Sequence, residues 1–210
     1  MSKLKTSGAL AVVGSIVLTA YLFVIRPWQL RWGATDEEVA RVMPGDSVVK
    51  DPTFNATRAV TVAARPEDIW PWLVQIGFGR AGWYSYDWID NFGRPSAGRI
   101  IPELQGLKVG DLVPLGPGDV AGFWVKALEP NRWMLWGDKK GEVTWFWGLY
   151  PQEDGSTRLI ARVRMQYNWA SLGMLFNIPV DVGDIVMMRK CLLGIKERAE
   201  AVAQQSRQGR

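Results

Sequence analysis

Two stretches decide the fold: TRLIARVRMQY at 157–167 and VGDIVMMRKCLLGIKERAEAVAQ at 182–204. Apolar and polar residues alternate along the first, which predicts a β-strand with one buried side and one solvent-facing side. Along the second, apolar residues recur at spacings of three and four, which predicts a long amphipathic helix. The expected buried side of the strand carries Leu159, Ala161, Val163, Met165 and Tyr167, and the expected wet side carries Arg158, Arg162, Arg164 and Gln166.

Further strands and short helices are expected toward the N-terminus. Helices are predicted from Pro66 to Ile76, from Tyr84 to Phe92 with Ser85 as cap, and from Thr35 to Met43 with a Thr35–Glu38 capping box. The fold class is therefore α+β: a helix-grip fold with a curved antiparallel sheet, two short helices and a long C-terminal helix, preceded by one N-terminal transmembrane helix. The other expected strands lie at 56–62, 100–105, 111–115, 122–128, 132–136 and 142–150.

Composition excludes several kinds of chemistry. The 210 residues include no histidine and one cysteine, Cys191, which excludes histidine-based nucleophile systems and His- or Cys-cluster metal sites. We expect no cofactor and no metal, and we assign no catalytic residue. The 25 basic and 21 acidic residues are interleaved, so the net charge of +4 does not predict nucleic-acid binding. The 12 tryptophans outnumber both phenylalanine and tyrosine.

Residues 8–25 predict a membrane-spanning helix. The stretch carries no charge, and a helix of that length measures about 27 Å, close to the thickness of the hydrocarbon core. Lys3 and Lys5 precede it, and Arg26 and Trp28 follow it as interfacial anchors. A cleaved signal peptide and a buried core helix are the alternatives, although the stretch is long for the former and apolar on every side. The basic flanks are nearly balanced, so the side of the membrane is undetermined.

The chain divides accordingly into five parts. They are a tail at 1–7, the transmembrane helix at 8–25, a juxtamembrane linker with a short helix at 26–53, the helix-grip domain at 54–204 and a polar tail at 205–210. We expect the linker to tether the domain to the membrane surface. The expected localisation is a membrane, through a single N-terminal pass.

Four segments resemble one superfamily: RPWQLRWGATDEEVARVMPGD at 26–46, TRAVTVAARPEDIWPWLVQIGFGRAGWYSYDWIDN at 57–91, RIIPELQGLKVGDLVPLGP at 99–117 and MMRKCLLGIKERAE at 187–200. On these the chain resembles the membrane-anchored branch of the SRPBCC superfamily, the START-like and pollen-allergen-like group that includes polyketide cyclase/dehydrase-like proteins. The resemblance implies an apolar cavity between sheet and long helix, and it implies no fixed reaction. Members bind lipids, sterols, hormones or polyketides, and only some are enzymes.

One loop departs from that resemblance. Sequences of the anchored type carry His-Ser-Ala-Asp ahead of Arg-Ile, whereas this chain reads Pro95-Ser96-Ala97-Gly98. Both the histidine and the acid are missing. Shared polar chemistry at this loop is therefore not implied.

Aromatic side chains dominate the candidate ligand contacts. Trp83, Tyr84, Tyr86 and Trp88 surround the second short helix, which borders the cavity mouth in helix-grip folds. There they would stack on a flat or apolar ligand and offer hydroxyls to it, with core packing as the alternative for both tryptophans. The predicted ligand-binding residues are Trp72, Tyr84, Tyr86, Trp88, Arg99, Trp145, Trp147, Met165, Tyr167 and Met188.

Trp145 and Trp147 share one face of the strand expected at 142–150. If that face points inward, their rings narrow or fill the cavity. A filled cavity would favour a structural role over ligand binding.

Charged residues are expected at the pocket rim: Arg99 and Glu103, with Asp87 and Arg94. An arginine there would pair with a ligand carboxylate or phosphate, and ordinary rim salt bridges are the alternative. Tyr86 and Asp87 also form a candidate acid/base pair for cyclisation or dehydration.

An apolar segment at 168–180 precedes the long helix. Its predicted role is a lid or a partner surface, carried by Trp169, Leu172, Met174, Leu175 and Phe176. It would cover the cavity, touch the bilayer or contact another protein, with packing against the sheet as the remaining alternative. Cys191 is expected to be a buried small apolar residue, since no histidine activates it.

Three functions remain open. The first is membrane-tethered binding or transport of a hydrophobic small molecule, such as a lipid, an isoprenoid or a polyketide, with the bilayer and that molecule as partners. The second is an accessory subunit of a larger membrane complex, with the cavity filled by tryptophans. The third is a cyclase or dehydratase. No nucleic-acid partner is expected.

Overall fold

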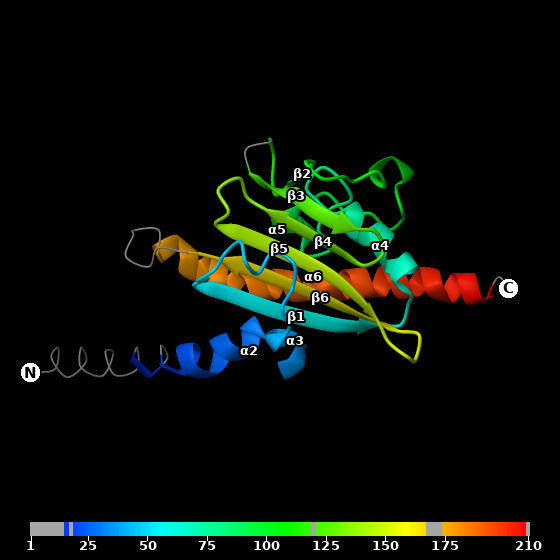
Figure 1. Ribbon diagram of the computed structural model, residues 1–210. Coiled ribbons are helices and arrows are strands. Elements are labelled where there is room, and N and C mark those ends of the chain that lie inside the picture. The colour runs from blue at the N-terminus through cyan, green and yellow to red at the C-terminus, as the bar shows by residue number, and fades with distance from the viewer. Residues whose placement is uncertain (1–14, 17–18, 119–120, 167–173, 209–210) are drawn as a thin grey trace, which may run out of the picture.

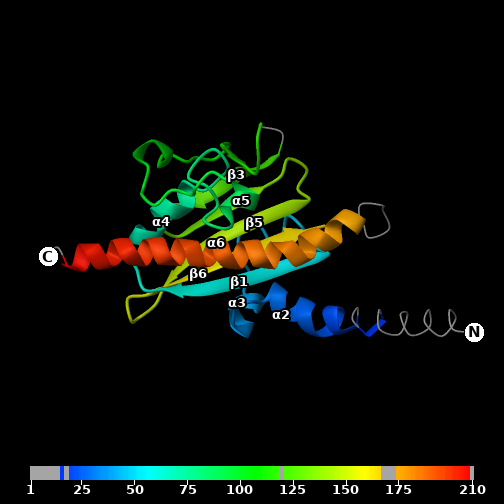
Figure 2. The same cartoon turned by 180° about the vertical axis from the view of Figure 1, so that it is seen from behind.

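The computed structural model describes residues 15–16, 19–118, 121–166 and 174–208, apart from the side chains of 174–182. Its centre is a six-stranded antiparallel sheet in the order β1-β6-β5-β4-β3-β2. The 35-residue helix α6 (Met174–Gln208) lies across one face of the sheet, as Figure 1 and Figure 2 show from opposite sides. This is the predicted helix-grip α+β arrangement. The strands are β1 (Phe54–Val62), β2 (Leu112–Pro114), β3 (Gly122–Glu129), β4 (Trp133–Gly137), β5 (Val143–Pro151) and β6 (Thr157–Met165).

Short helices lie before and between the strands. They are η1 (Tyr21–Ile25), α2 (Arg26–Leu30), α3 (Asp36–Ala40), α4 (Pro66–Val74), α5 (Asp87–Asp90) and η2 (Pro102–Leu104). The predicted capping box of α3 is confirmed. Thr35 Oγ1 accepts a hydrogen bond from the Glu38 N–H at 3.2 Å, and Glu38 Oε2 accepts one from the Thr35 N–H at 2.9 Å. Pro71 lies inside α4 without ending it.

The prediction of a strand at 100–105 is wrong. Those residues form η2 and flanking loop, with no neighbouring strand. Pro102 has no N–H to give to a ladder, and the Gln75 side chain takes the place of a partner strand. Its Oε1 accepts from the Ile101 N–H at 2.9 Å and from Gln105 Nε2 at 3.1 Å.

The helix predicted at Tyr84–Phe92 is shorter than expected, and its cap is wrong. Tyr84 has a φ of +55°, a left-handed conformation that no α-helix accepts, so α5 begins only at Asp87. Tyr86 is the N-cap residue, without a side-chain bond to the helix. Ser85 instead donates to the Met187 carbonyl of α6 at 3.1 Å.

The side of β6 that carries Arg158, Arg162 and Arg164 is covered by protein, so the prediction that it faces solvent is wrong. Residues 33–51 lie along the outer face of the sheet, opposite α6, where Ala34 and Met43 pack against Leu135 and Phe146. Helix α2 lies beside the edge strand β1 (Figure 1, Figure 2), and Leu30 and Trp32 pack against the core on the α6 side of the sheet. Arg158 donates to both carboxylate oxygens of Glu38, at 2.8 and 2.7 Å. Arg164 donates to the Val49 carbonyl at 2.9 Å. The alternation along β6 was read correctly, but its polar side serves as a docking surface for residues 33–51.

Arg162 is the centre of this docking surface. It is 3% exposed and donates five bonds: to Thr57 on β1, to Asp46, and to the carbonyls of Glu38, Val39 and Arg41, at distances of 2.7–2.9 Å. A guanidinium offers five N–H donors in a planar fork. Arg162 therefore ends α3 by satisfying carbonyls that the helix leaves unpaired.

Arg58 on β1 extends the contact to α6. It is 1% exposed, donates from Nε to the Gln29 carbonyl at 2.9 Å and forms an ion pair with Asp184. It thereby links α2, β1 and α6. The linker, whose predicted role is to tether the domain to the membrane surface, is thus packed against the domain through buried charge-assisted bonds.

Acid is expected to weaken this docking through Glu38. Burial opposes ionisation of Glu38, but bonds from Arg158 and the Thr35 N–H outweigh it, so the pKa lies below its usual 4.5. A depressed folded-state pKa contributes stability above the unfolded value that is lost as pH falls through the folded one. The melting temperatures of the parent protein and Glu38→Gln should therefore converge below about pH 4.5. A pH-independent gap between the two melting curves would contradict the assignment.

Within the described residues, no helix combines the length and apolarity needed to cross a bilayer. Residues 8–14 and 17–18 of the predicted span lie outside those residues. The spanning helix at 8–25 stays a prediction.

Candidate functional site

Indole rings cover the inner face of the sheet, which faces α6. Trp136 on β4 and Trp145 on β5 are register partners, and Trp147 follows two residues along β5. The Trp145 and Trp147 ring centroids lie 5.2 Å apart, and Trp136 is edge-on to both, at 5.4 and 5.6 Å. Trp83 stacks on Trp145 at 5.7 Å with an interplanar angle of 6°. These four residues, named the indole layer below, occupy the place that the resemblance assigns to an apolar cavity.

The indole layer holds unpaired hydrogen-bond donors. Nε1 of Trp136, Trp145 and Trp147 is buried and has no acceptor among the described residues, and the same is true of Trp72 on α4. A buried donor without an acceptor costs about 1–3 kcal/mol. Phenylalanine would avoid that cost, so the donors point to a use other than packing.

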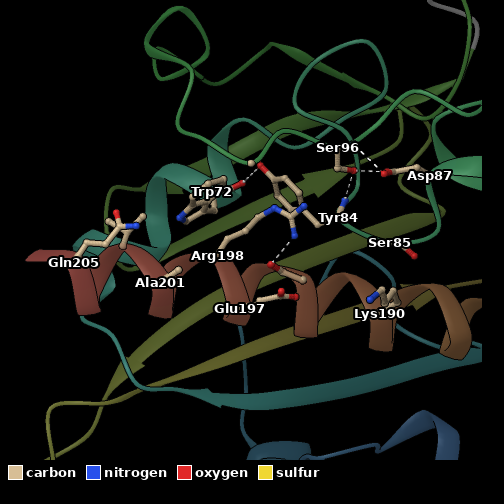
Figure 3. Close-up of a pocket in the computed structure, with 13 residues that line it drawn as sticks. Trp72, Tyr84, Ser85, Asp87, Ser96, Lys190, Glu197, Arg198, Ala201 and Gln205 are labelled. Atoms are coloured by element: carbon tan, nitrogen blue, oxygen red, sulfur yellow. Dashed lines mark hydrogen bonds between the residues drawn. The ribbon is translucent and has the colours of Figure 1, made fainter.

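A groove lies beside the indole layer, between α6 and the segment at 84–98 (Figure 3). Its volume is about 490 Å³. Tyr84 forms its floor: the hydroxyl donates to the Trp72 carbonyl at 3.2 Å and accepts from Gln75 Nε2 at 2.8 Å. Burial raises the pKa of Tyr84 far above its ordinary value of 10. This phenol stays protonated at neutral pH and cannot serve as a general base.

The segment at 84–98 is held by Asp87. Its Oδ2 accepts from the Ser96 N–H at 2.9 Å, and its Oδ1 accepts from the Ser96 hydroxyl at 2.5 Å and from Asn91 at 3.0 Å. Ser96 in turn accepts from the Tyr84 N–H at 3.0 Å. Both Asp87 oxygens are committed to loop structure, which disfavours the acid/base role considered for Tyr86 and Asp87.

Two further titratable groups lie under this segment. Burial raises the pKa of Asp90, whose Oδ2 has no partner in the described structure. Burial also raises the pKa of Cys191, which is 3% exposed and packs in the core. Cys191 is a buried apolar residue, as predicted.

The predicted ligand contacts do not converge on one site. Trp145, Trp147 and Met188 face the interior, and Trp72 and Tyr84 line the groove. Trp88 is 75% exposed on α5, so neither core packing nor ligand stacking inside the domain describes it. The remaining predictions are placed as follows: Tyr86 and Met165 are partly buried, Arg99 is exposed, Tyr167, Trp169 and Leu172 lie outside the described residues, and so do the side chains of Met174, Leu175 and Phe176.

Sequence analysis missed Trp136 and Arg198. The alternation of Met134 with Trp136 in the expected strand at 132–136 was the available signal for Trp136. Arg198 carries no such signal, because its position beside Tyr84 depends on how α6 packs against the segment at 84–98. Of the charged residues predicted at the rim, Asp87 lines the groove, whereas Arg94, Arg99 and Glu103 are not among its lining residues. No ion pair joins Arg99 or Glu103 to another described residue.

Topology and site define the class of protein: an α+β helix-grip domain with an aromatic inner face. Among solved structures, the chain is similar to a conserved protein of unknown function, EF2215, from Enterococcus faecalis (11% identity, 79% of this chain and 95% of that one, TM-score 0.43). It is also similar to the Polyketide_cyc-like protein Cgl2372 from Corynebacterium glutamicum (18% identity, 73% and 91%, TM-score 0.34). A third is the Aha1 dimer from Colwellia psychrerythraea (16% identity, 70% and 96%, TM-score 0.36). No protein-family model and no curated protein matches this chain.

Proposed function

We propose that this protein is a membrane-tethered domain that binds a hydrophobic small molecule against its indole layer. The observation that carries the proposal is the set of three unpaired donors on Trp136, Trp145 and Trp147. An apolar molecule with one carbonyl or ether oxygen would bury surface against the rings and accept a hydrogen bond from an indole N–H that has no acceptor among the described residues. Entry requires the rings to separate, and the stacked pair Trp83 and Trp145 retains 6% and 9% exposure at the edge of the layer.

Exposed apolar residues support the membrane tether. Phe23 is 76% exposed, Val24 67% and Leu22 45%, all on η1. Arg26 and the exposed Trp28 follow directly, in the order typical of a membrane interface. Such a helical turn, apolar and outward-facing, is stable where lipid rather than water surrounds it. Docking of residues 26–51 would then hold the domain at a set orientation to the bilayer.

An accessory-subunit role is the second candidate, and two observations favour it. The indole layer fills the inner face with rings in mutual contact. In addition, Trp88 and Phe92 are 75% and 67% exposed on and beside α5, next to Ile89 at 43%. Exposed apolar patches of this kind mark contacts with another protein.

Native mass spectrometry of the full chain, extracted from its own membranes in a mild detergent, separates the two candidates. Ligand binding predicts a reproducible added mass of a few hundred daltons on the monomer. A bare chain found only within a larger assembly would overturn the ligand proposal and leave the subunit role.

Substituting Trp147 with phenylalanine tests the role of the donors. The loss of ring contacts is offset by removal of an unpaired N–H, so the free energy of unfolding should change by no more than about 1 kcal/mol. In native mass spectrometry, a smaller fraction of the protein should carry the added mass. Trp133→Phe is the matched control, because Trp133 lies on the same sheet but donates to Glu129 at 2.9 Å, and its replacement should leave the added mass unchanged. A destabilisation of several kcal/mol by Trp147→Phe in denaturant titration would contradict the expected offset between lost ring contacts and the removed N–H.

A further inference from the structure

Arg198 is a groove residue whose positive charge has no carboxylate partner in the described part of the chain. Its Nε donates to the Ala97 carbonyl at 2.9 Å and its Nη1 to the Gly194 carbonyl at 3.0 Å. The guanidinium carbon lies 4.7 Å from the centroid of the Tyr84 ring. Within the described chain, no carboxylate comes within 4.0 Å of Arg198. Carbonyls and a ring orient the cation but supply no counter-charge.

Trp72 gives an independent sign of a ligand at the same place. It is 1% exposed and lines the groove, and its Nε1 has no acceptor among the described residues. In Figure 3 the indole nitrogen lies on the side of the ring that faces Gln205 on α6. Trp72 Nε1 is therefore a donor aimed into the groove.

The walls between these two groups suit a small amphiphile. Ala201 and Val202 of α6 supply apolar surface, and the groove volume of about 490 Å³ is that of a small-molecule site. Lys190 and Glu197 lie exposed at the rim and offset each other in charge, while the Asp87 carboxylate is taken by Ser96 and Asn91. Asp87 keeps its negative charge because Ser96 and Asn91 are neutral, so the four charged side chains that line the groove sum to zero. Among the described residues, Arg198 nevertheless has no carboxylate within 4.0 Å.

We propose that this groove is a second binding site, separate from the indole layer, for a small molecule that carries a carboxylate. One carboxylate oxygen would pair with Arg198 and the other would accept from Trp72 Nε1, while the apolar part lies along Ala201 and Val202. This site does not depend on whether the indole layer binds a ligand.

Titration of the full chain in non-ionic detergent tests the site, with the indole N–H resonances as readout and Trp72→Phe to assign the Trp72 signal. Sodium hexanoate is the probe, hexanamide the uncharged isostere, and inorganic phosphate a second anion. We expect hexanoate to shift the Trp72 signal saturably and the other two to leave it in place. Arg198→Gln should weaken the hexanoate effect about tenfold, the loss of one charge-assisted pair. Arg207→Gln, an exposed α6 arginine outside the groove, should not weaken it.

Several outcomes would overturn the proposal. An equal response to hexanamide would show that charge is not recognised, and a response to phosphate alone would exclude a carboxylate site. Hexanoate shifts confined to other indoles would place binding at the indole layer instead. If Arg198→Gln fails to fold by far-UV circular dichroism, Arg198→Lys serves in its place. Unchanged hexanoate affinity in Arg198→Lys would then reject the role of the planar guanidinium.

Discussion

Replacing Arg162 with leucine is expected to lower the free energy of unfolding by about 3–5 kcal/mol and to release residues 26–51 from the sheet. Leucine removes five donors at once. Asp46 would keep only the Met43 N–H at 2.9 Å and the more distant Arg164 at 3.8 Å, and the carbonyls of Glu38, Val39 and Arg41 would lose the donors that Arg162 supplies. Breaking a buried charge pair on one side leaves the other charge uncompensated, which is the costly case. Denaturant titration measures the stability, and hydrogen exchange across residues 26–51 measures the release.

Arg132→Leu is the matched control. Arg132 lies near the start of β4, is 69% exposed and pairs only with Glu129. An exposed pair of this kind contributes about 0–1 kcal/mol, so this variant should unfold close to the parent protein. Equal stability losses in the two variants would mean that burial of Arg162 does not matter, and an Arg162→Leu protein with unchanged exchange across 26–51 would refute the docking argument.

Gly194→Ala is expected to destabilise the protein by at least about 2 kcal/mol, although alanine is the better helix former by about 1 kcal/mol. A Cβ at position 194 would lie 2.2 Å from the Tyr84 carbonyl oxygen and 2.9 Å from the Tyr84 Cβ. The first contact is with backbone, and Tyr84 is already held in a left-handed conformation, so neither side can yield cheaply. The melting temperature should fall, and the groove beside Tyr84 should open.

Gly183→Ala on the same helix provides the comparison. No atom of the described residues lies within 4 Å of a Cβ at Gly183, so the gain in helix propensity should appear there undiminished. The two alanine variants are thus expected to change stability in opposite directions. A melting temperature raised in both would show that α6 and the segment at 84–98 do not approach as closely as their packing indicates.

All six strands and the central part of the long helix followed from local sequence pattern, because periods of two and of three to four reflect which side of an element is buried. The helix itself runs from Met174 to Gln208, longer at both ends than the predicted 182–204 and extending into the segment predicted to precede it. The capping box of α3 was also predictable from sequence, because it consists only of reciprocal hydrogen bonds between Thr35 and Glu38, which are three residues apart. The strand predicted at 100–105 failed because its hydrogen-bond partner is the side chain of Gln75, which is 26 residues away from Ile101 in the chain.

The sequence by itself determined the fold class, the absence of histidine and cysteine-cluster chemistry, and which side of β6 is apolar. Only the tertiary structure decided what covers the polar side. Alternation shows that Arg158, Arg162 and Arg164 share a face. It does not show whether water or a folded-back segment of the chain accepts the hydrogen bonds of their guanidinium groups. The choice between them rests on contacts more than 100 residues apart in the chain, such as Arg162 with Asp46. The same holds for the donors of the indole layer and the groove, since a missing partner is visible only when every neighbour has been placed.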